Sequence, residues 1–326
     1  GSFAFYAENY DQLIDSPCGV SANLRTKEFV VDGRRLNVAA FNKPQAVDLD
    51  AYVEICSKAV GAAKELFGEL PFSSYWFMFD FGGPGGGLEH KDSFRIGLGA
   101  RANAQRSAGI IFHEYFHAYN VKRIRSRPLG PFEYAKPAVT GALWWLEGVT
   151  DYYSDVLLAR AGLTTREEFL SSAARSYLSL HKNPVAFTIS ADECSRRVWE
   201  TRGSQGFGGL SYYQKGWNVG MALDLAIRSE TGGKKSLDDV MRRLYMETKD
   251  GPGFEEGRIR EICIEIGGGW LADVYDAAVM RPGEIPISES LRAMGLALTD
   301  TTFVTDVTQS EQSQAIGRQW PFPPLR

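Results

Sequence analysis

The chain has few cysteines and few histidines, and it lacks any long apolar run. Only four residues of each type occur among its 326 residues. No stretch of about 20 apolar residues is present, so the sequence contains no candidate for a transmembrane helix. The cysteines are far apart and form no C-x-x-C pair. Their spacing argues against a structural zinc knuckle and leaves disulfide bonds undecided.

The chain also lacks a strong excess of charge. Its formal net charge is -4, which gives no electrostatic basis for binding nucleic acid or an anionic membrane. The hydrophobic content of 44% and the charged content of 23% are ordinary for a globular protein. A chain of this length can bury a large core, and it suggests two packed sublobes or domains.

The compartment and the oligomeric state cannot be read from the sequence. Gly1 and Ser2 look like the remnant of an expression tag, so we expect any natural signal peptide to be missing. We expect a bacterial protein, and the sequence does not choose between periplasm and cytoplasm.

The first hundred residues contain the signals of strands. Two β-rich runs flank Asp32-Gly33 in KEFVVDGRRLNVAAF, which predicts a hairpin with a two-residue turn. Residues 1–46 are too few for a full domain, so we expect the remnant of a larger β-rich domain or an edge hairpin. Apolar residues at a spacing of three to four predict a helix from about Asp48. Strands are predicted over residues 73–81 and 94–100, with a glycine-rich segment between them.

Helix signals dominate from about Asn103. They predict a first helix to about Asn120, helices over residues 141–162 and 213–230, and another that begins after Ser236. Strands followed by helices predict an α+β domain over residues 47–295, with the site between two sublobes. The mixed α/β sublobe would span residues 47–102, the helical sublobe residues 103–295, and residues 296–326 would form a C-terminal extension.

The sequence AGIIFHEYFHAYN contains an H-E-x-x-H pattern. Residues four apart lie on one face of a helix, so His113 and His117 can bind the same metal ion. Glu114 lies about 100° round the helix, where a general base for a metal-bound water is expected. The alternative is two ordinary histidines on a helix surface or in the core.

A catalytic zinc normally has a third protein ligand. The extended pattern that places a third histidine six residues on is absent, since Arg123 occupies that position. We expect Glu147 instead, because an unpaired carboxylate within the apolar WWLEGV would be costly. Asp151 follows one helical turn later, where it could accept the second N–H of a ligating histidine. The alternative is that Glu147 and Asp151 form a solvated helix edge.

Three motifs together resemble one family. HEYFHAYNVKRIR, LWWLEGVTDYY and SYYQKG occur in this order and resemble the glycyl aminopeptidase family of gluzincins, which are zinc peptidases with a thermolysin-like catalytic domain. The likeness extends over about residues 47–295. It implies one zinc ion per chain, held by His113, His117 and Glu147, with Glu114 as the general base.

The chain departs from this family at both ends. Family members usually have a β-rich domain before the catalytic part, of which residues 1–46 could be at most a remnant. Many also have a PDZ domain after it, and residues 296–326 show no recognisable PDZ pattern. Whether the chain is trimmed or a short natural member stays open.

A second likeness concerns the substrate. Gly86-Gly87-Leu88-Glu89-His90 resembles the G-x-M-E-N signature of related aminopeptidases, which implies that Glu89 binds the free α-ammonium group. Glycines permit close approach of an extended peptide to the backbone. The alternative is a plain glycine-rich turn between strands. His90 could support Glu89 or line the pocket, and we do not expect it to bind zinc.

Tyr213 matches the tyrosine of the Y-x-K-G pattern in related aminopeptidases, where it donates to the oxyanion. A phenol keeps its proton at neutral pH and can stabilise developing negative charge. A core aromatic at a helix start is the alternative, and Tyr212 is the candidate if the register is shifted by one. We expect a structural role for the basic run from Lys122 to Arg127, and we interpret His181 as a surface residue in a loop-like stretch.

Taken together, the patterns and the resemblance predict a zinc-dependent aminopeptidase. Its substrates would be peptides with a free N-terminus, and the resemblance implies a small first residue, glycine or alanine. Two other interpretations stay open: an endopeptidase that uses the same zinc site, and a peptide-binding module that no longer catalyses hydrolysis.

Overall fold

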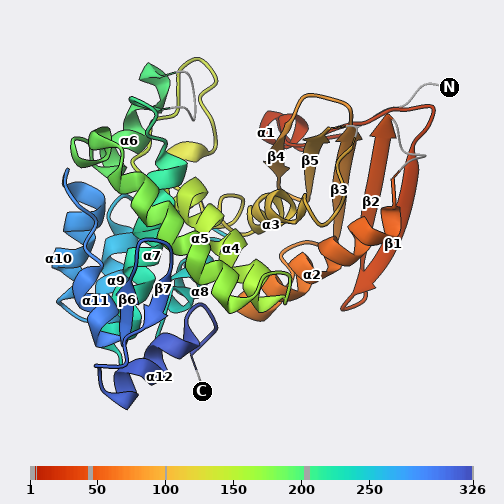
Figure 1. The fold of residues 1–326 in the computed structure, drawn as a ribbon. Helices are drawn as coiled ribbons and strands as arrows, with labels where there is room; N and C mark the ends of the chain where they lie inside the picture. Colours follow the sequence, from red (N-terminus) through yellow and green to blue (C-terminus); the bar gives the residue numbers. More distant parts are fainter. Residues whose placement is uncertain (1–3, 5, 43–46, 100, 202–205, 325–326) are drawn as a thin grey trace. The chain divides into compact units, whose positions relative to one another are not determined.

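The computed structural model describes residues 4, 6–42, 47–99, 101–201 and 206–324. The chain divides into two compact units, residues 1–122 and residues 123–326, which can be followed by colour in Figure 1. Unit 1 contains the larger sheet and unit 2 is mainly helical. The predicted α+β class, with strands first and helices after, is confirmed.

Unit 1 is built on a five-stranded sheet whose strand order is β1-β2-β3-β5-β4. Its elements are α1 (Tyr10–Ile14), β1 (Arg25–Val31), β2 (Arg34–Asn42), α2 (Leu49–Phe67), β3 (Ser74–Phe81), β4 (Gly86–His90), β5 (Ser93–Leu98) and α3 (Ala108–Phe116). The β2–β3 and β3–β5 pairs are parallel, while β1–β2 and β4–β5 are antiparallel. The strands β1 and β4 therefore form the two edges of this sheet.

The predicted hairpin is present as β1 and β2. Asp32 and Gly33 occupy the turn with φ of 51° and 71°, the left-handed values that a two-residue hairpin turn needs and that Asp-Gly tolerates. Because β2 also pairs with β3, the hairpin belongs to the same sheet as the later strands. The predicted domain ranges themselves stay predictions.

An aromatic core attaches α3 to the sheet. Tyr115 of α3 packs on Tyr75 and Phe77 of β3, with ring centroids 5.3 and 5.6 Å apart. Tyr52 of α2 packs on Phe79 of the same strand at 4.7 Å, and Figure 1 shows α2 running along the sheet. These residues alternate along β3, so they lie on one face of it. Burial of these rings fixes the helix that carries the H-E-x-x-H motif.

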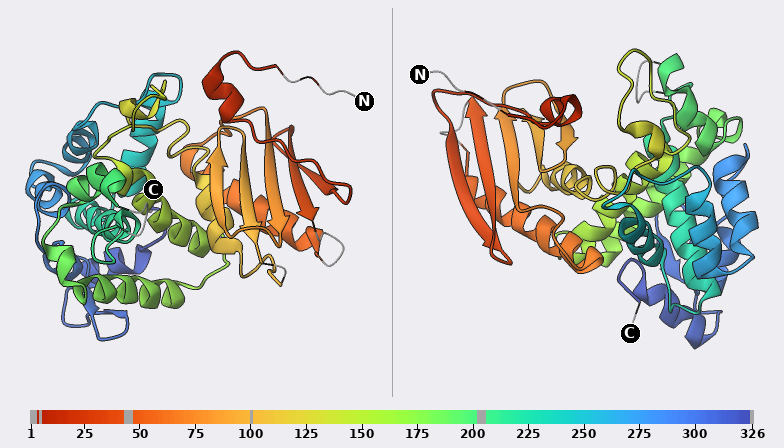
Figure 2. Two further views of the ribbon diagram at one scale, coloured as in Figure 1. Left: turned by 90° about the horizontal axis from the view of Figure 1, so that it is seen from above. Right: turned by 180° about the vertical axis from the view of Figure 1, so that it is seen from behind.

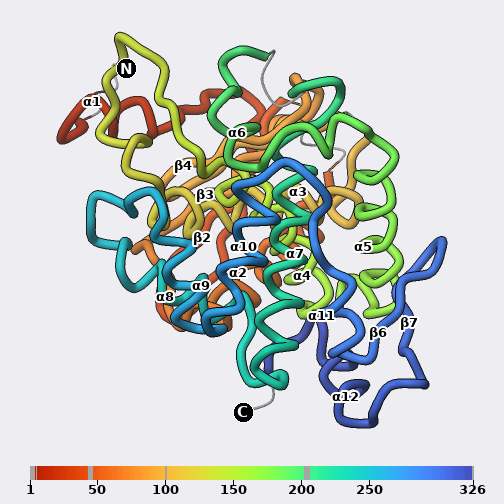
Figure 3. The backbone as a smooth tube through the Cα atoms, turned by 90° about the vertical axis from the view of Figure 1, so that its left-hand side faces the viewer, coloured from red at the N-terminus to blue at the C-terminus, as the bar shows by residue number. Residues whose placement is uncertain are grey.

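Unit 2 is a set of helices with a small two-stranded sheet. Its longer elements are α4 (Thr150–Arg160), α5 (Arg166–His181), α6 (Ala191–Arg196), α7 (Tyr212–Glu230), α8 (Leu237–Thr248), α9 (Arg258–Gly267), α10 (Leu271–Tyr275), α11 (Ser288–Ala293), β6 (Leu296–Leu298), β7 (Phe303–Thr305) and α12 (Glu311–Gln319). Short 3-10 turns cover Arg127–Leu129, Pro184–Phe187 and Arg197–Glu200, and π-helical segments cover Trp144–Val149 and Asp276–Met280. Figure 3 shows β6, β7 and α12 beside α11.

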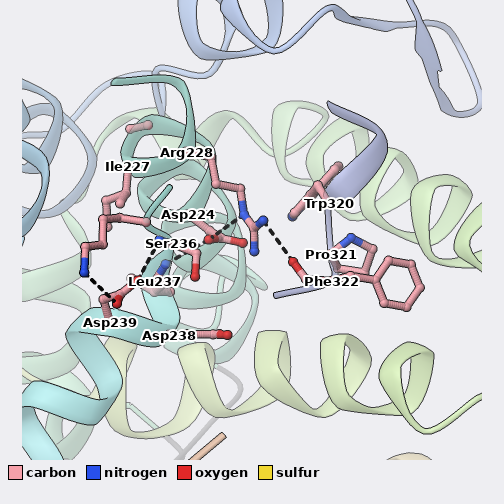
Figure 4. A network of polar contacts seen from close by, with 12 residues as sticks. Asp224, Ile227, Arg228, Ser236, Leu237, Asp238, Asp239, Trp320, Pro321 and Phe322 are labelled. Carbon is pink, nitrogen blue, oxygen red and sulfur yellow. Dashed lines mark hydrogen bonds and ion pairs between the residues drawn. The ribbon is translucent and has the colours of Figure 1, made fainter. Parts of the chain in front are cut away.

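A network of buried charged residues lies in the core of unit 2 (Figure 4). Asp224 of α7 accepts hydrogen bonds from the Tyr152 hydroxyl at 2.7 Å and from Arg228 Nε at 3.0 Å. It also accepts the Leu237 backbone N–H at 2.9 Å. Arg228 donates in turn to the carbonyl oxygen of Phe322 at 3.0 Å.

A second ion pair lies in the same core. Arg160 donates to both carboxylate oxygens of Asp238, at 3.0 and 3.2 Å, and to the Pro321 carbonyl oxygen. Asp238 also accepts from the Tyr153 hydroxyl at 3.0 Å. Trp320 is fully buried, so the segment around it packs into the core of unit 2.

Several local predictions were wrong or incomplete. His181 ends helix α5 instead of lying in a loop, and its Nδ1 lies 2.8 Å from the Tyr177 carbonyl oxygen. All four cysteines are free. No helix in the described part of the chain has the length and apolar character of a membrane-spanning segment.

Candidate active site

The two histidines of the motif face each other in unit 1. His113 lies in the last turn of α3, and His117 follows directly as its C-terminal cap. Their Nε2 atoms are 3.0 Å apart. Two ring nitrogens at this distance point at a common position, as the four-residue spacing predicts. The pair therefore fits a site that takes one metal ion.

The turn after α3 orients His117. The helix was predicted to reach Asn120 but ends at Phe116, and the chain turns so that the Asn120 carbonyl oxygen lies 2.7 Å from Nδ1 of His117. A backbone carbonyl can only accept, so Nδ1 carries the proton and Nε2 keeps its lone pair for a metal. Asn120 thus provides for His117 the kind of contact that the sequence analysis expected Asp151 to make with one of the two histidines.

Gly87 gives room to the predicted base. Glu114 is only 6% exposed, and a Cβ atom on Gly87 would lie 2.0 Å from its Oε1. Any side chain at this position would displace the Glu114 carboxylate. Gly86 has a φ of 113°, which residues with a side chain rarely adopt. The two glycines therefore shape the approach of β4 to α3.

Glu89 lies beside the motif. The alternative interpretation of its segment was a glycine-rich turn, but residues Gly86–His90 form the edge strand β4, in which Glu89 pairs with Phe94. Glu89, Glu114 and His117 form a group whose ligand atoms lie within 4.8 Å of one another. The strand thus brings a second carboxylate to the base and the histidine.

His90 does not support Glu89. Successive side chains of a strand point to opposite faces, and the Nδ1 atom of His90 lies 3.4 Å from Asp15. Asp15 also accepts from the Lys91 backbone N–H and from Lys122 Nζ, both at 2.8 Å. Burial raises the pKa of Asp15, but the contacts with His90 and Lys122 lower it by more, so its pKa lies below the usual value. This cluster attaches α1 to the end of β4 and gives Lys122 a structural contact; Figure 2 shows the short red helix α1 beside that part of the sheet.

Glu147 lies in unit 2, on the π-helical segment Trp144–Val149. The sequence predicted a helix over residues 141–162. The wider π turn instead shifts Glu147 relative to the α4 residues that follow, and such turns often occur at functional positions.

A crossing of two glycines places Glu147 next to Tyr213. A Cβ atom on Gly148 would lie 2.5 Å from the Cα atom of Gly216, and one on Gly216 would lie 2.1 Å from the Trp144 carbonyl oxygen. The π segment and the start of α7 therefore touch backbone to backbone. This explains why glycine follows Glu147 and ends the Y-x-K-G pattern. The sequence analysis assigned no role to either glycine.

Tyr213 is hydrogen-bonded to Glu147. Burial, and then the charge of Glu147, raise the pKa of Tyr213 well above its usual value, so the phenol keeps its proton and remains a donor. Tyr212 is buried and stacks on Tyr213, with ring centroids 4.8 Å apart. The contact with Glu147 therefore belongs to Tyr213, in the predicted register.

Tyr213 and Asp151 also line a cavity in unit 2. Its volume is about 370 Å³. The other lining residues come from α4, α5 and the start of α7: Ser154, Asp155, Ser176, Ser211, Gln214 and Trp217. The structure thus brings Glu89, Glu114 and His117 together in unit 1, and Glu147, Tyr213 and Asp151 in unit 2. The catalytic roles of these residues stay predictions.

Comparison with known families supports the resemblance. Residues 106–219 match the model of the M61 glycyl aminopeptidase family. The predicted family resemblance is confirmed. The match covers the H-E-x-x-H motif, Glu147 and Tyr213 in one stretch. Among curated proteins, none matches the sequence.

Three solved structures of hydrolases share the fold. An aminopeptidase N family protein from Idiomarina loihiensis is 24% identical with a TM-score of 0.79, over 89% of this chain and 52% of that one. Yeast LTA4 hydrolase is 15% identical with a TM-score of 0.57, over 79% and 39%. A mutant M1 zinc metallopeptidase from Deinococcus radiodurans, bound to a Tyr-Ser-Ala substrate, is 12% identical with a TM-score of 0.57, over 82% and 54%.

These likenesses confirm the predicted fold class, a thermolysin-like peptidase domain. The chain spans about half the length of the Idiomarina protein and less of the yeast enzyme.

Proposed function

We propose that the protein is a zinc-dependent aminopeptidase. The observation that carries this proposal is the position of Glu89 beside Glu114 and His117 in unit 1. A carboxylate next to the base can bind the free ammonium group of a peptide and set the distance from the chain end to the reacting bond. An endopeptidase has no use for such a group.

The metal would be one zinc ion per chain, held by His113, His117 and Glu147. Two imidazoles and a carboxylate are a donor set typical of catalytic zinc, with the fourth position left for water. His117 fits this role because its Nδ1 faces the Asn120 carbonyl oxygen and its Nε2 faces that of His113. When bound, zinc lowers the pKa of a water and polarises the substrate carbonyl. Asp151 is our candidate acceptor for the second ring nitrogen of His113.

The protein's own side chains would carry the proton transfers. Glu114 takes a proton from the water that attacks the carbonyl carbon of the first peptide bond. It then gives this proton to the leaving nitrogen as the C–N bond breaks. Tyr213 donates a hydrogen bond to the carbonyl oxygen as negative charge develops there. Losing one such donor typically lowers the rate about 10²- to 10³-fold.

The substrate would bind along β4. As an edge strand, β4 offers backbone groups to an extended peptide, and its glycines bring that backbone close to the substrate. Glu89 would pair with the α-ammonium group. The family resemblance further suggests that the first residue is small, glycine or alanine.

A pair of peptides tests this function. The zinc-loaded protein should cleave Ala-Ala-Phe and leave N-acetyl-Ala-Ala-Phe intact, measured by chromatography of the products. Equal cleavage of both peptides would show an endopeptidase. Glu89→Gln should reduce cleavage of the free peptide, mainly by raising KM, because the ammonium group loses its ionic partner.

A second variant tests the base. Glu114→Gln should lower kcat by about 10²-fold or more while the zinc content, measured by metal analysis, stays near one per chain. Zinc binding without cleavage of any peptide by the unmodified protein would instead indicate a peptide-binding module.

A further inference from the structure

The cavity beside Tyr213 has no occupant in the proposed reaction. Its volume of about 370 Å³ lies within the range of small-molecule pockets. Tyr213 at its wall is the residue proposed to contact the scissile carbonyl, so the cavity opens next to the reacting bond. A first residue as small as glycine or alanine has no side chain that could fill it.

Its lining is rich in hydrogen-bond acceptors and negative charge. Two carboxylates, Asp151 and Asp155, line it together with three serines and Gln214. Neither lysine, arginine nor histidine is among the described residues that line it. The negative charge of Asp155 in a partly buried site favours a positively charged ligand.

Among these groups, Asp155 is the best candidate to bind a cation in the cavity. Its Oδ2 accepts the indole N–H of Trp217 at 3.0 Å, and its other oxygen accepts no hydrogen bond from the described residues. Burial raises the pKa of Asp155 to about 6, against the Trp217 hydrogen bond and with a contribution from the Asp151 charge. One carboxylate oxygen is thus available to a donor from the cavity.

The serines can add further acceptors. Ser176 Oγ accepts from Asn218 Nδ2 at 3.1 Å, and Ser211 Oγ accepts from the Tyr213 backbone N–H at 3.1 Å. A hydroxyl oxygen has two lone pairs, so each can accept once more. An ammonium group has three N–H donors and no acceptor, and it matches this lining better than a neutral or an anionic group does.

We propose that this cavity binds the basic side chain of the second substrate residue, the one that follows the scissile bond. Asp155 forms the ionic contact, and the serine hydroxyls hold the remaining N–H groups. The proposal rests on the proposed function, since it uses the position of Tyr213 at the scissile carbonyl and a small first residue.

Two peptides that differ only in charge test this specificity. Ala-Lys-Ala and Ala-norleucine-Ala have side chains of similar shape, and only lysine carries an ammonium group. We expect kcat/KM for the lysine peptide to be at least tenfold higher, mainly through KM. Equal values for the two peptides would overturn the proposal.

Variants connect the preference to this cavity. Asp155→Asn keeps the size and the Trp217 contact, and it should bring the lysine to norleucine ratio close to one. Asp155→Glu restores the charge and should recover most of the preference. The matched control is Asp250→Asn, which removes one charge at an exposed position of unit 2 and should leave the ratio as in the wild type. An unchanged ratio in Asp155→Asn would overturn the proposal.

A binding measurement separates this inference from the proposed function. Titration of the Glu114→Gln protein with both peptides by calorimetry should show weaker binding of the norleucine peptide. If wild-type protein cleaves neither peptide but this difference in affinity remains, the aminopeptidase function fails while the basic subsite stands. If both peptides are cleaved with equal affinity and rate, the subsite fails alone.

Discussion

Asp238 is buried and Asp155 half-buried in unit 2, and of these two carboxylates only Asp238 has an arginine opposite it. Burial disfavours charge on Asp238, yet Arg160 and Arg228 outweigh this effect and hold its pKa below the usual value. Asp155 has the Trp217 indole as its partner, and burial raises its pKa to about 6. Figure 4 shows the neighbourhood of Asp238, where the carbonyl oxygen of Phe322 accepts a hydrogen bond from Arg228.

The comparison separates charges that stabilise the fold from charges that can serve a ligand. Arg160 makes two hydrogen bonds with Asp238, so that pair is neutralised inside the protein. No lysine, arginine or histidine is among the described residues that line the cavity around Asp155, so a positively charged ligand would stabilise the ionised form of this carboxylate. Such an uncompensated group is more characteristic of a binding site than of a core.

The largest expected effect comes from breaking the arginine pair. Asp238→Asn leaves the Arg160 guanidinium buried without its counter-charge, which typically costs about 3–5 kcal/mol of unfolding free energy. The variant should unfold at a clearly lower urea concentration, measured by circular dichroism. A loss below about 1 kcal/mol would contradict the idea that this pair holds the C-terminal segment in the core.

The same substitution at Asp155 should have the opposite sign. In the folded protein its pKa is about 6, against 3.8 for the reference carboxyl, so between these values the folded state binds the proton more tightly. The unfolding free energy of the wild type therefore falls as pH rises from about 4 to 6, and Asp155→Asn removes this loss. Above pH 6 the variant should be more stable by about 1–3 kcal/mol, and the two proteins should converge below pH 4.

Thermal melts of both proteins from pH 3.5 to 7.5 measure this difference. Equal stabilities over the whole range would show that Asp155 is solvated like a surface carboxylate. The comparison with Asp238 would then lose its basis.

The smallest effect is expected at the surface. Glu261 is one of three carboxylates around Arg258 and is 62% exposed. Glu261→Gln should change the unfolding free energy by less than about 1 kcal/mol, because exposed ion pairs contribute little. Urea unfolding of this variant and of Asp238→Asn, measured side by side, compares the two losses of unfolding free energy. Equal losses would contradict the expected difference between buried and exposed ion pairs.

Signals that act over a few residues were predicted well from the sequence. Asp48 caps α2 through the backbone N–H groups of Asp50 and Ala51, Asp32-Gly33 forms its turn, and α8 begins after Ser236. The H-E-x-x-H spacing gave the facing pair of histidines for the same reason. In each case the interacting groups are close neighbours along the chain.

Features that depend on distant partners were missed. The segment Gly86–His90 has few side chains to indicate a strand, and its conformation comes from pairing with β5. The motif helix ends early because the Asn120 carbonyl turns to His117. The contact between Glu147 and Tyr213 was not predicted from their positions in the sequence. Asp155 was not singled out either, because the residues that line its cavity come from three separate helices.

The crossing of Gly148 and Gly216 determines which substitutions the proposed site can tolerate. Because the two backbones touch directly, the spacing between Glu147 and Tyr213 is set by main-chain atoms rather than by the size of neighbouring side chains. Residues around them can then be exchanged without altering this spacing, whereas a methyl group at either glycine would separate the two functional side chains at once.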